Sequence, residues 1–299
     1  MNDITSLDRY GRAAERAANE IIAAYSTSFG MATRLLGTRH RQHVRNIYAL
    51  VRVADELVDG VTDEAGLTLE QQHAALDRMI DETYRALQLG CSSDLVIHAF
   101  ARTAGACGID ASLVGPFFDS MRTDLDARVT APKNVVTFDA AAHDDYVYGS
   151  AEVVGLMCLR VFQRDQRPDA ATADRLDEGA RMLGAAFQNV NFLRDLRDDT
   201  DRLGRSYLGT AERLTDADRQ TWVRTIRAQL DAAAATIPLL PKDARAAVRS
   251  AHALFSALNE RIADTTVDEL YRTRIRVPDP VKARLITGAV LTTWTEGRA

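Results

Sequence analysis

Residues 45–60 read RNIYALVRVADELVDG, and apolar residues recur around most of the helix that this stretch would form. Such a pattern favours an α-helix that is buried on several sides. One face departs from it, because polar residues recur there every three or four positions: Tyr48, Arg52, Asp55 and Asp59. At about 100° per residue these side chains lie within roughly 60° of arc. The helix is therefore predicted to carry one polar stripe, and Gly60 directly after it suits a helix C-cap.

A second stretch, residues 184–205, repeats the pattern far along the chain with the sequence GAAFQNVNFLRDLRDDTDRLGR. Its polar stripe spans roughly 80° of arc and comprises Gln188, Asn191, Asp195 and Asp199. Two close carboxylates repel each other and resist burial, and a divalent cation removes both problems. Each stripe ends in such a pair. The two pairs together predict that metal ions with oxygen ligands hold a diphosphate between the helices.

The competing interpretation is that each stripe is a solvated helix face with ordinary ion pairs, such as Arg52 with the aspartates that follow it. Such pairs are common on surface helices and stabilise a protein little. The repetition of the pattern on two otherwise apolar helices argues against this interpretation.

Composition narrows the function classes. The chain has 299 residues, of which 46% are hydrophobic and 26% charged, and its net charge of −5 does not favour nucleic-acid binding. Lysine occurs only three times, so anion binding must fall to arginine or to metal. The three cysteines show no C-x-x-C spacing, which argues against structural zinc and predicts a reducing, cytoplasmic setting. The start of the chain lacks the apolar region of a signal peptide, and no run of 18 apolar residues predicts a membrane span.

The chain is predicted to be all-α, because helix-forming residues dominate and most of the seven prolines separate apolar-periodic stretches. One domain over 1–299 is the simpler organisation, since no linker or repeat interrupts the pattern. The expected helices are 11–36, 40–59, 69–89, 92–107, 110–128, 139–163, 172–200, 215–237, 242–272 and 279–295.

Four blocks of this sequence resemble the squalene/phytoene synthase family of isoprenoid synthases. They are Tyr25–Phe29 (YSTSF), Tyr48–Asp59 (YALVRVADELVD), Tyr146–Gly155 (YVYGSAEVVG), and Phe187–Asp199 (FQNVNFLRDLRDD) with Gly204–Leu208 (GRSYL). The resemblance spans about residues 20–210 and implies a helical fold around a central cavity. Members of the family join two prenyl diphosphates head to head.

The resemblance also implies roles for individual residues. The expected ligands of Mg²⁺, with Mn²⁺ as an alternative, are Asp55, Asp59, Asn191, Asp195 and Asp199. The expected contacts to diphosphate are Arg52, Arg194, Arg205, Arg274, and Ser26 or Ser28. The side chains expected near the reacting carbons or the leaving group are Tyr48, Tyr146, Gln188 and Tyr207. For the late arginine, Arg272 and Arg276 are alternatives to Arg274.

The sequence departs from the family at two places. Glu152 replaces a small residue in the central motif, so its side chain must point away from the cavity or find a partner. Phe255 lies in a region where many members carry a tyrosine. The tyrosines at 48 and 146 could also be core tyrosines with satisfied hydroxyls, and the small residues at 149–151 and 155 could serve close helix packing as well as cavity space.

The expected reaction couples two C20 geranylgeranyl diphosphates to phytoene through a cyclopropyl diphosphate, as in carotenoid synthesis. The alternative is squalene or dehydrosqualene from two C15 farnesyl diphosphates, with NADPH needed only for squalene. The small side chain of Thr33 favours the longer chain. A relative without catalysis that acts as an assembly protein is the alternative of another class. Apolar products suggest peripheral contact with a membrane.

Overall fold

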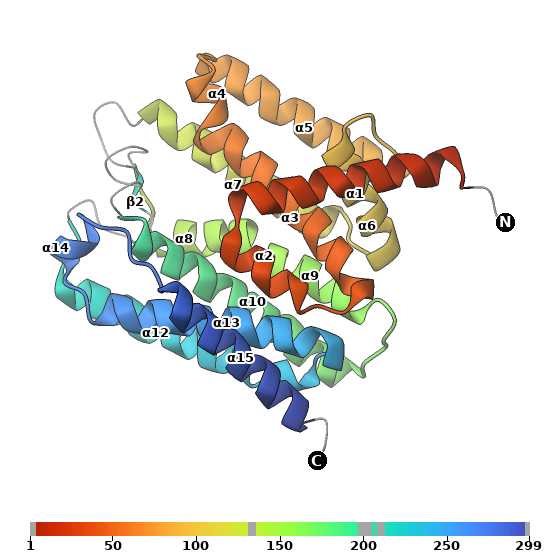
Figure 1. The fold of residues 1–299 in the computed structure, drawn as a ribbon. Coiled ribbons are helices and arrows are strands. Elements are labelled where there is room, and N and C mark those ends of the chain that lie inside the picture. Colours follow the sequence, from red (N-terminus) through yellow and green to blue (C-terminus); the bar gives the residue numbers. More distant parts are fainter. Residues whose placement is uncertain (1–3, 131–135, 197–204, 207, 209–212, 297–299) are drawn as a thin grey trace.

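The computed structural model describes residues 4–130, 136–196, 205–206, 208 and 213–296 of the chain. Helices account for nearly all of this, which confirms the all-α prediction (Figure 1). In the first half they are α1 Ser6–Tyr25, α2 Thr27–Arg34, α3 Thr38–Asp59, α4 Val61–Glu64, α5 Leu69–Leu89, α6 Leu95–Cys107, α7 Ala111–Thr130 and α8 Ala140–Val147. They continue as the π-helix η1 Tyr148–Glu152, α9 Val153–Gln163, α10 Ala170–Arg194, α12 Asp216–Ala234, the 3₁₀-helix η2 Ile237–Leu239, α13 Lys242–Ala263, α14 Val267–Leu270 and α15 Asp279–Glu296.

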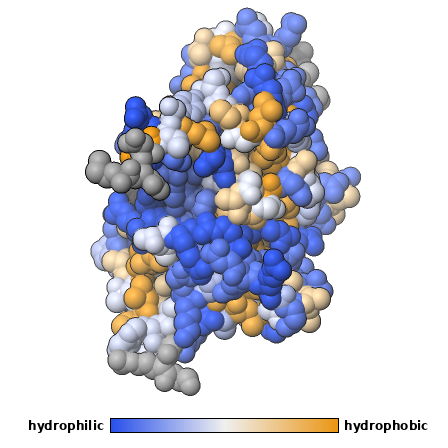
Figure 2. All heavy atoms as spheres, turned by 90° about the vertical axis from the view of Figure 1, so that its right-hand side faces the viewer, coloured by the Kyte–Doolittle hydropathy of each residue, from blue (hydrophilic) through white to orange (hydrophobic). Residues whose placement is uncertain are grey.

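Two strands of two residues each, β1 Val136–Thr137 and β2 Arg205–Ser206, pair in parallel and tie distant segments together. Within the described ranges, no helix has both the length and the apolar character needed to cross a membrane. The face drawn in Figure 2 is mainly hydrophilic, with apolar patches between the polar side chains.

Local chemistry explains where the helices begin and end. The predicted helix 11–36 is two helices, because Ser26 has extended backbone and its hydroxyl accepts a hydrogen bond from the Phe29 amide, which caps α2. The predicted helix 242–272 likewise divides into α13 and α14, and Thr266 caps the second. Pro116 lies inside α7 without ending it.

The core consists of two clusters of buried apolar side chains. One gathers around α3, α6, α7 and α9, and the other around α8, α12, α13 and the end of α10. Helix α10 contributes to both, with Leu176 in the first and Leu193 in the second. It therefore crosses from one cluster to the other, as its long path through the middle of Figure 1 shows.

Close backbone approaches fix the relative directions of α9 and α10. A Cβ atom at Gly155 would lie 2.5 Å from the carbonyl oxygen of Ala180, and a Cβ atom at Gly184 would lie 2.6 Å from that of Ala151. Later residues of one helix thus meet earlier residues of the other, so α9 and α10 are antiparallel.

The far end of α9 meets the beginning of α3. The Phe162 ring packs edge-on against His40, with 5.5 Å between centroids, and Arg164 just beyond α9 hydrogen-bonds His43 at 2.7 Å. Since α3 and α9 pack side by side and the end of α9 meets the beginning of α3, the two helices are antiparallel, and α3 runs in the same direction as α10. The carboxyl ends of α3 and α10, which carry the two polar stripes, lie at the same end of the fold.

Candidate active site

The α3 stripe occupies the accessible side of an otherwise well-buried helix, since all four members are half-buried. The Tyr48 ring stacks on Phe29 of α2 at 5.2 Å, and burial raises the pKa of the Tyr48 hydroxyl. Arg52 lies over the Tyr25 ring at 4.5 Å and pairs with Glu56 one turn further on. The guanidinium thus has a carboxylate partner outside the aspartate pair.

The carboxyl group of Asp55 lies where negative charge is unfavourable. Although the side chain is only half-buried, the protein atoms packed around the carboxyl group raise the pKa of Asp55 well above its ordinary value. The carboxylates of Asp59, Asp124 and Glu56 raise the pKa of Asp55 further, against the opposing effect of Arg52. A cation bound here would remove this penalty.

On α10 the described members of the stripe are also half-buried. Among the described residues, the buried Oδ1 atom of Asn191 has no hydrogen-bond partner. Asp195 ends the helix and is held by two arginines, Arg194 Nη2 at 2.6 Å and Arg274 Nε at 2.7 Å. Arg274, the first choice among the three late arginines that the sequence left open, therefore lies beside the second stripe.

One acidic residue near the site was missed by the sequence interpretation. Asp124 of α7 is buried, its Oδ2 accepts a 2.8 Å hydrogen bond from the Tyr146 hydroxyl, and its charge acts on Asp55. The available signal was its place on the apolar face of α7, where it follows the buried Phe117 and Met121 at helical spacing. Tyr146 is thus a buried tyrosine with a satisfied hydroxyl, and its partner connects it to the first stripe.

Other predicted site residues are less fully defined. Asp199 and Tyr207 lie outside the described residues, and Arg205 is placed only through its strand backbone in β2. Ser28 lies in α2. The Ser26 hydroxyl caps α2 and also hydrogen-bonds Tyr48, which lowers the pKa of Tyr48 in part. Gln188 follows Phe187, whose ring stacks on Phe255 at 3.7 Å.

An apolar cavity of about 250 Å³ lies between α2, α3, α9, α10 and α13. Among the described residues, no charged side chain lines it. The hydroxyls of Thr33 and Thr236, which do line it, donate to carbonyls of their own turns at 2.9 Å. The wall therefore offers the cavity mainly hydrocarbon.

The cavity begins next to the polar stripes. Its last lining residue on α3 is Val51, one turn before Asp55, and on α10 it is Phe187, two turns before Asp195. From there the lining continues backward along α10 to Leu176, which is about 16 Å of helix. The apolar cavity therefore begins close to the two helix ends that carry the aspartates.

The small residues of the central motif, 149–151 and 155, serve both close helix packing and cavity space. A Cβ atom at Gly149 would lie 2.3 Å from the Pro116 carbonyl oxygen of α7, so close packing excludes a side chain. Ser150, Ala151 and Gly155 also line the cavity. Glu152 points away from the cavity lining and accepts a 2.7 Å hydrogen bond from Arg181 Nε of α10.

The donor set fits a hard divalent cation, which prefers oxygen ligands. Two observations support this fit: Asn191 Oδ1 is buried and has no hydrogen-bond partner within the described ranges, and the Asp55 carboxylate is destabilised as an anion. In the described part of the chain, no three or more His, Cys, Asp and Glu side chains form a group that could hold one ion. Asn191 and bound diphosphate oxygens would have to complete the coordination, together with Asp199.

Comparison with known proteins agrees with this geometry. The family model "squalene/phytoene synthase" matches residues 22–280. Chloroplastic phytoene synthase 3 of Zea mays is 30% identical over 218 residues, which are 71% of this chain and 47% of that protein. Chloroplastic phytoene synthase 1 of Arabidopsis thaliana is 31% identical over 205 residues, 68% of this chain and 44% of that protein. This chain therefore belongs to the squalene/phytoene synthase family.

The fold is shared with a solved relative. The crystal structure of a dehydrosqualene synthase in complex with a ligand superposes with a TM-score of 0.78 at 20% identity, covering 97% of this chain and all of that one. The chain spans about half the length of the curated relatives it matches.

Proposed function

We propose that the chain condenses two prenyl diphosphates head to head, with geranylgeranyl diphosphate as substrate and phytoene as product. The observation that carries the proposal is the apolar cavity that begins one helical turn before Asp55 on α3 and two turns before Asp195 on α10. A diphosphate needs cations to bind it, and a polyprenyl chain needs a dry apolar cavity. Here the aspartates that would hold the cations lie next to one end of the apolar cavity.

Mg²⁺ held by Asp55, Asp59, Asn191, Asp195 and Asp199 would supply the positive charge that makes diphosphate a better leaving group. Arg194 and Arg274 now neutralise Asp195. With Asp195 bound to a cation instead, both guanidiniums would be available to hold diphosphate oxygens. The stripe on α3 binds and orients the diphosphate from the opposite side with Arg52.

The cavity must protect allylic cations from water and from nucleophiles. Among the described residues of its wall, Cys158 carries the one thiol, and burial raises the pKa of this thiol to about 12. The group is therefore neutral at physiological pH and is a poor nucleophile. Thr33 presents a small side chain to the cavity beside Phe29, which supports the choice of the longer C20 chain.

Loss of a proton closes the cyclopropane ring, and Tyr146 is the group that we assign to this step. Its Oη already directs its proton to Asp124 Oδ2. It can therefore accept a proton on the oxygen while its own proton passes to the carboxylate. Released diphosphate is the alternative acceptor.

The test is incubation of the purified protein with Mg²⁺ and C15 or C20 diphosphate, with and without NADPH, followed by mass spectrometry of the extracted hydrocarbons. We expect phytoene from the C20 substrate without NADPH. If only the C15 substrate gave a product, squalene or dehydrosqualene, the substrate would be farnesyl diphosphate rather than geranylgeranyl diphosphate. Absence of diphosphate release from either substrate would contradict the enzymatic function and favour an assembly role.

A further inference from the structure

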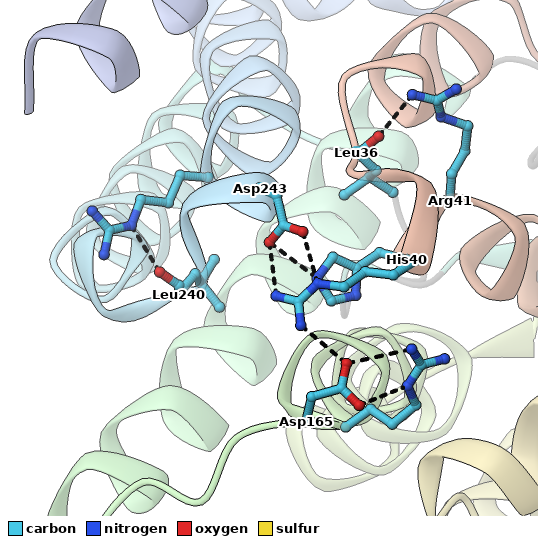
Figure 3. A network of polar contacts seen from close by, with 9 residues as sticks. Leu36, His40, Arg41, Asp165, Leu240 and Asp243 are labelled. Carbon is cyan, nitrogen blue, oxygen red and sulfur yellow. Dashed lines mark hydrogen bonds and ion pairs between the residues drawn. The ribbon is translucent and has the colours of Figure 1, made fainter. Parts of the chain in front are cut away.

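On the side away from the aspartates, the cavity lining includes Leu36, Phe162 and Leu240. A group of charged side chains lies beside this part of the lining, and Figure 3 shows its polar contacts. This floor cluster consists of Arg39, His40, Asp165 and Asp243. It joins three segments that are distant in sequence: the start of α3, the turn after α9 and the start of α13.

Asp243 is the centre of the floor cluster. Arg39 binds it through two parallel hydrogen bonds, Nε to Oδ2 at 2.8 Å and Nη2 to Oδ1 at 3.0 Å. His40 Nε2 lies 3.2 Å from the same Oδ1, and Arg39 Nη1 reaches Asp165 at 3.0 Å. Arg39 lowers the pKa of Asp243 to about 2, so the pair is charged at any physiological pH. Paired guanidinium–carboxylate bonds of this kind fix geometry as well as distance.

The floor cluster is directly connected to the apolar residues that close the cavity. Leu36 precedes Gly37, whose amide donates a 2.8 Å hydrogen bond to the Asp243 carbonyl oxygen. Phe162 packs edge-on against His40. Leu240 lies just before α13. Each floor residue thus comes from a different segment, and the cluster holds the three segments together.

The approach of the segments is unusually close at one point. A Cβ atom at Gly37 would lie 2.5 Å from Asp243 Oδ2, so only glycine permits this contact. Leu36 is fixed from the other side as well, because Arg41 Nη2 donates to its carbonyl oxygen at 2.8 Å (Figure 3). The floor is therefore held by directional polar bonds in addition to apolar packing.

We propose that the Arg39–Asp243 pair determines the length of prenyl chain that the cavity accepts, by holding Leu36, Phe162 and Leu240 together as its floor. This inference rests on the proposed function. Without the pair, the starts of α3 and α13 lose two charge-assisted hydrogen bonds, and the backbone bond from Gly37 to Asp243 remains. The floor then yields to a longer chain, whereas the catalytic end of the cavity, at the opposite ends of α3 and α10, is unchanged.

The experiment compares coupling of the C20 diphosphate with that of its C25 homologue, geranylfarnesyl diphosphate, in an equimolar mixture. Asp243→Asn and Arg39→Gln break the same pair from its two sides. We expect the C25-to-C20 product ratio to rise roughly tenfold in each, which is the scale on which apolar pockets discriminate chain length. The control is Asp77→Asn, which removes an exposed 2.9 Å ion pair with Arg122 between α5 and α7, and should leave the ratio unchanged.

Circular dichroism and thermal unfolding verify that each variant is folded. An unchanged product ratio in the folded variants would overturn the inference. Wild-type protein that couples neither substrate would instead contradict the proposed function. Calorimetric binding of C20 and C25 S-thiolodiphosphate analogues then measures the same discrimination without turnover, and equal affinity ratios in wild type and variants would again overturn the role of the pair.

Discussion

Asp55 and Asp195 occupy opposite electrostatic settings at the level of single residues. Burial and neighbouring carboxylates destabilise the ionised form of Asp55, whereas two arginines neutralise the charge of Asp195. In the described part of the chain, Asp55 therefore has no guanidinium ion pair like the two that hold Asp195, although the charge of Arg52 acts on it from nearby. A metal bound with diphosphate would satisfy both, by relieving Asp55 and by releasing the arginines toward the phosphate oxygens.

Asp55→Asn should raise stability without metal and lower activity. A carboxyl group whose pKa is raised by folding loses stability as pH rises above its unfolded value near 4, so at pH 7 its ionised form opposes folding. The amide removes that penalty but also a metal ligand. We expect a higher Tm in EDTA, loss of the Tm increase that Mg²⁺ and diphosphate produce in the wild type, and at least about a hundredfold lower kcat. Full activity in this variant would contradict the metal assignment.

The cysteines should differ sharply in reactivity. Cys91 is exposed, whereas Cys107 is buried and Cys158 lines the cavity with a pKa raised to about 12. Because the thiolate is the reactive form, dithionitrobenzoate should modify one thiol rapidly in the native protein and all three only after unfolding. Cys91→Ser should abolish the rapid phase. A rapid phase that survives this substitution would show that the cavity wall opens to solvent.

The two stripes could be predicted at the residue level because helical periodicity places their members on one face without any tertiary information. Asp124 could not be placed in the same way. Its partner Tyr146 is 22 residues away, and only the packing of α7 against α8 and η1 brings them together. The partner of Glu152 could not be predicted for the same reason, because Arg181 lies 29 residues later in the chain.

At the level of elements, the sequence predicted that helices exist better than where they end. The break at Ser26 depends on a single hydroxyl that caps α2, and the π-helix at Tyr148–Glu152 interrupts what reads as one continuous helix. This π-helix lies where Gly149 touches the backbone of α7. Tertiary contact and local capping, which periodicity does not report, decided these details.

Close backbone packing of α10 predicts a strong response to one added methyl group. A Cβ atom at Gly184 would lie 2.6 Å from the Ala151 carbonyl oxygen, and neither helix can move without disturbing the cavity wall. Gly184→Ala should lower the free energy of unfolding by about 1–3 kcal/mol. The matched control is Gly105→Ala in α6, where a Cβ atom meets nothing within 4 Å, and which should raise stability by about 0.5–1 kcal/mol. Urea unfolding measures both, and equal effects would contradict the packing argument.

At the level of the whole molecule, the proposed function depends on the relative directions of α3 and α10. Periodicity showed that α3 and α10 carry matching stripes, but not that the two helices run the same way. That follows from α9, which is antiparallel to both and meets them at its two ends. The directions of these helices therefore determine the layout of the cavity. The aspartates lie at one end of α3 and α10, and the floor cluster lies at the other end of the cavity.

Buried histidines should make the whole fold less stable as pH falls. Burial lowers the pKa of four of the six histidines: His40, His43, His98 and His252. Between about pH 7 and pH 5 the unfolded chain then binds protons that the folded protein does not. The free energy of unfolding therefore decreases as the pH is lowered, by at most about 1.4 kcal/mol per pH unit for each histidine. Asp55 acts in the opposite sense, so the slope of one histidine must be isolated.

His98→Asn isolates that slope. His98 is completely buried, and its Nδ1 accepts a hydrogen bond from the Ser92 amide, a bond that an asparagine oxygen can accept in its place. Urea unfolding at pH 7.5, 6.5 and 5.5 should show a shallower loss of stability in the variant than in the wild type, because one proton-binding group is absent from the unfolded chain. Parallel curves for the two proteins would mean that His98 takes up its proton equally well in both states, and that its burial does not oppose charge.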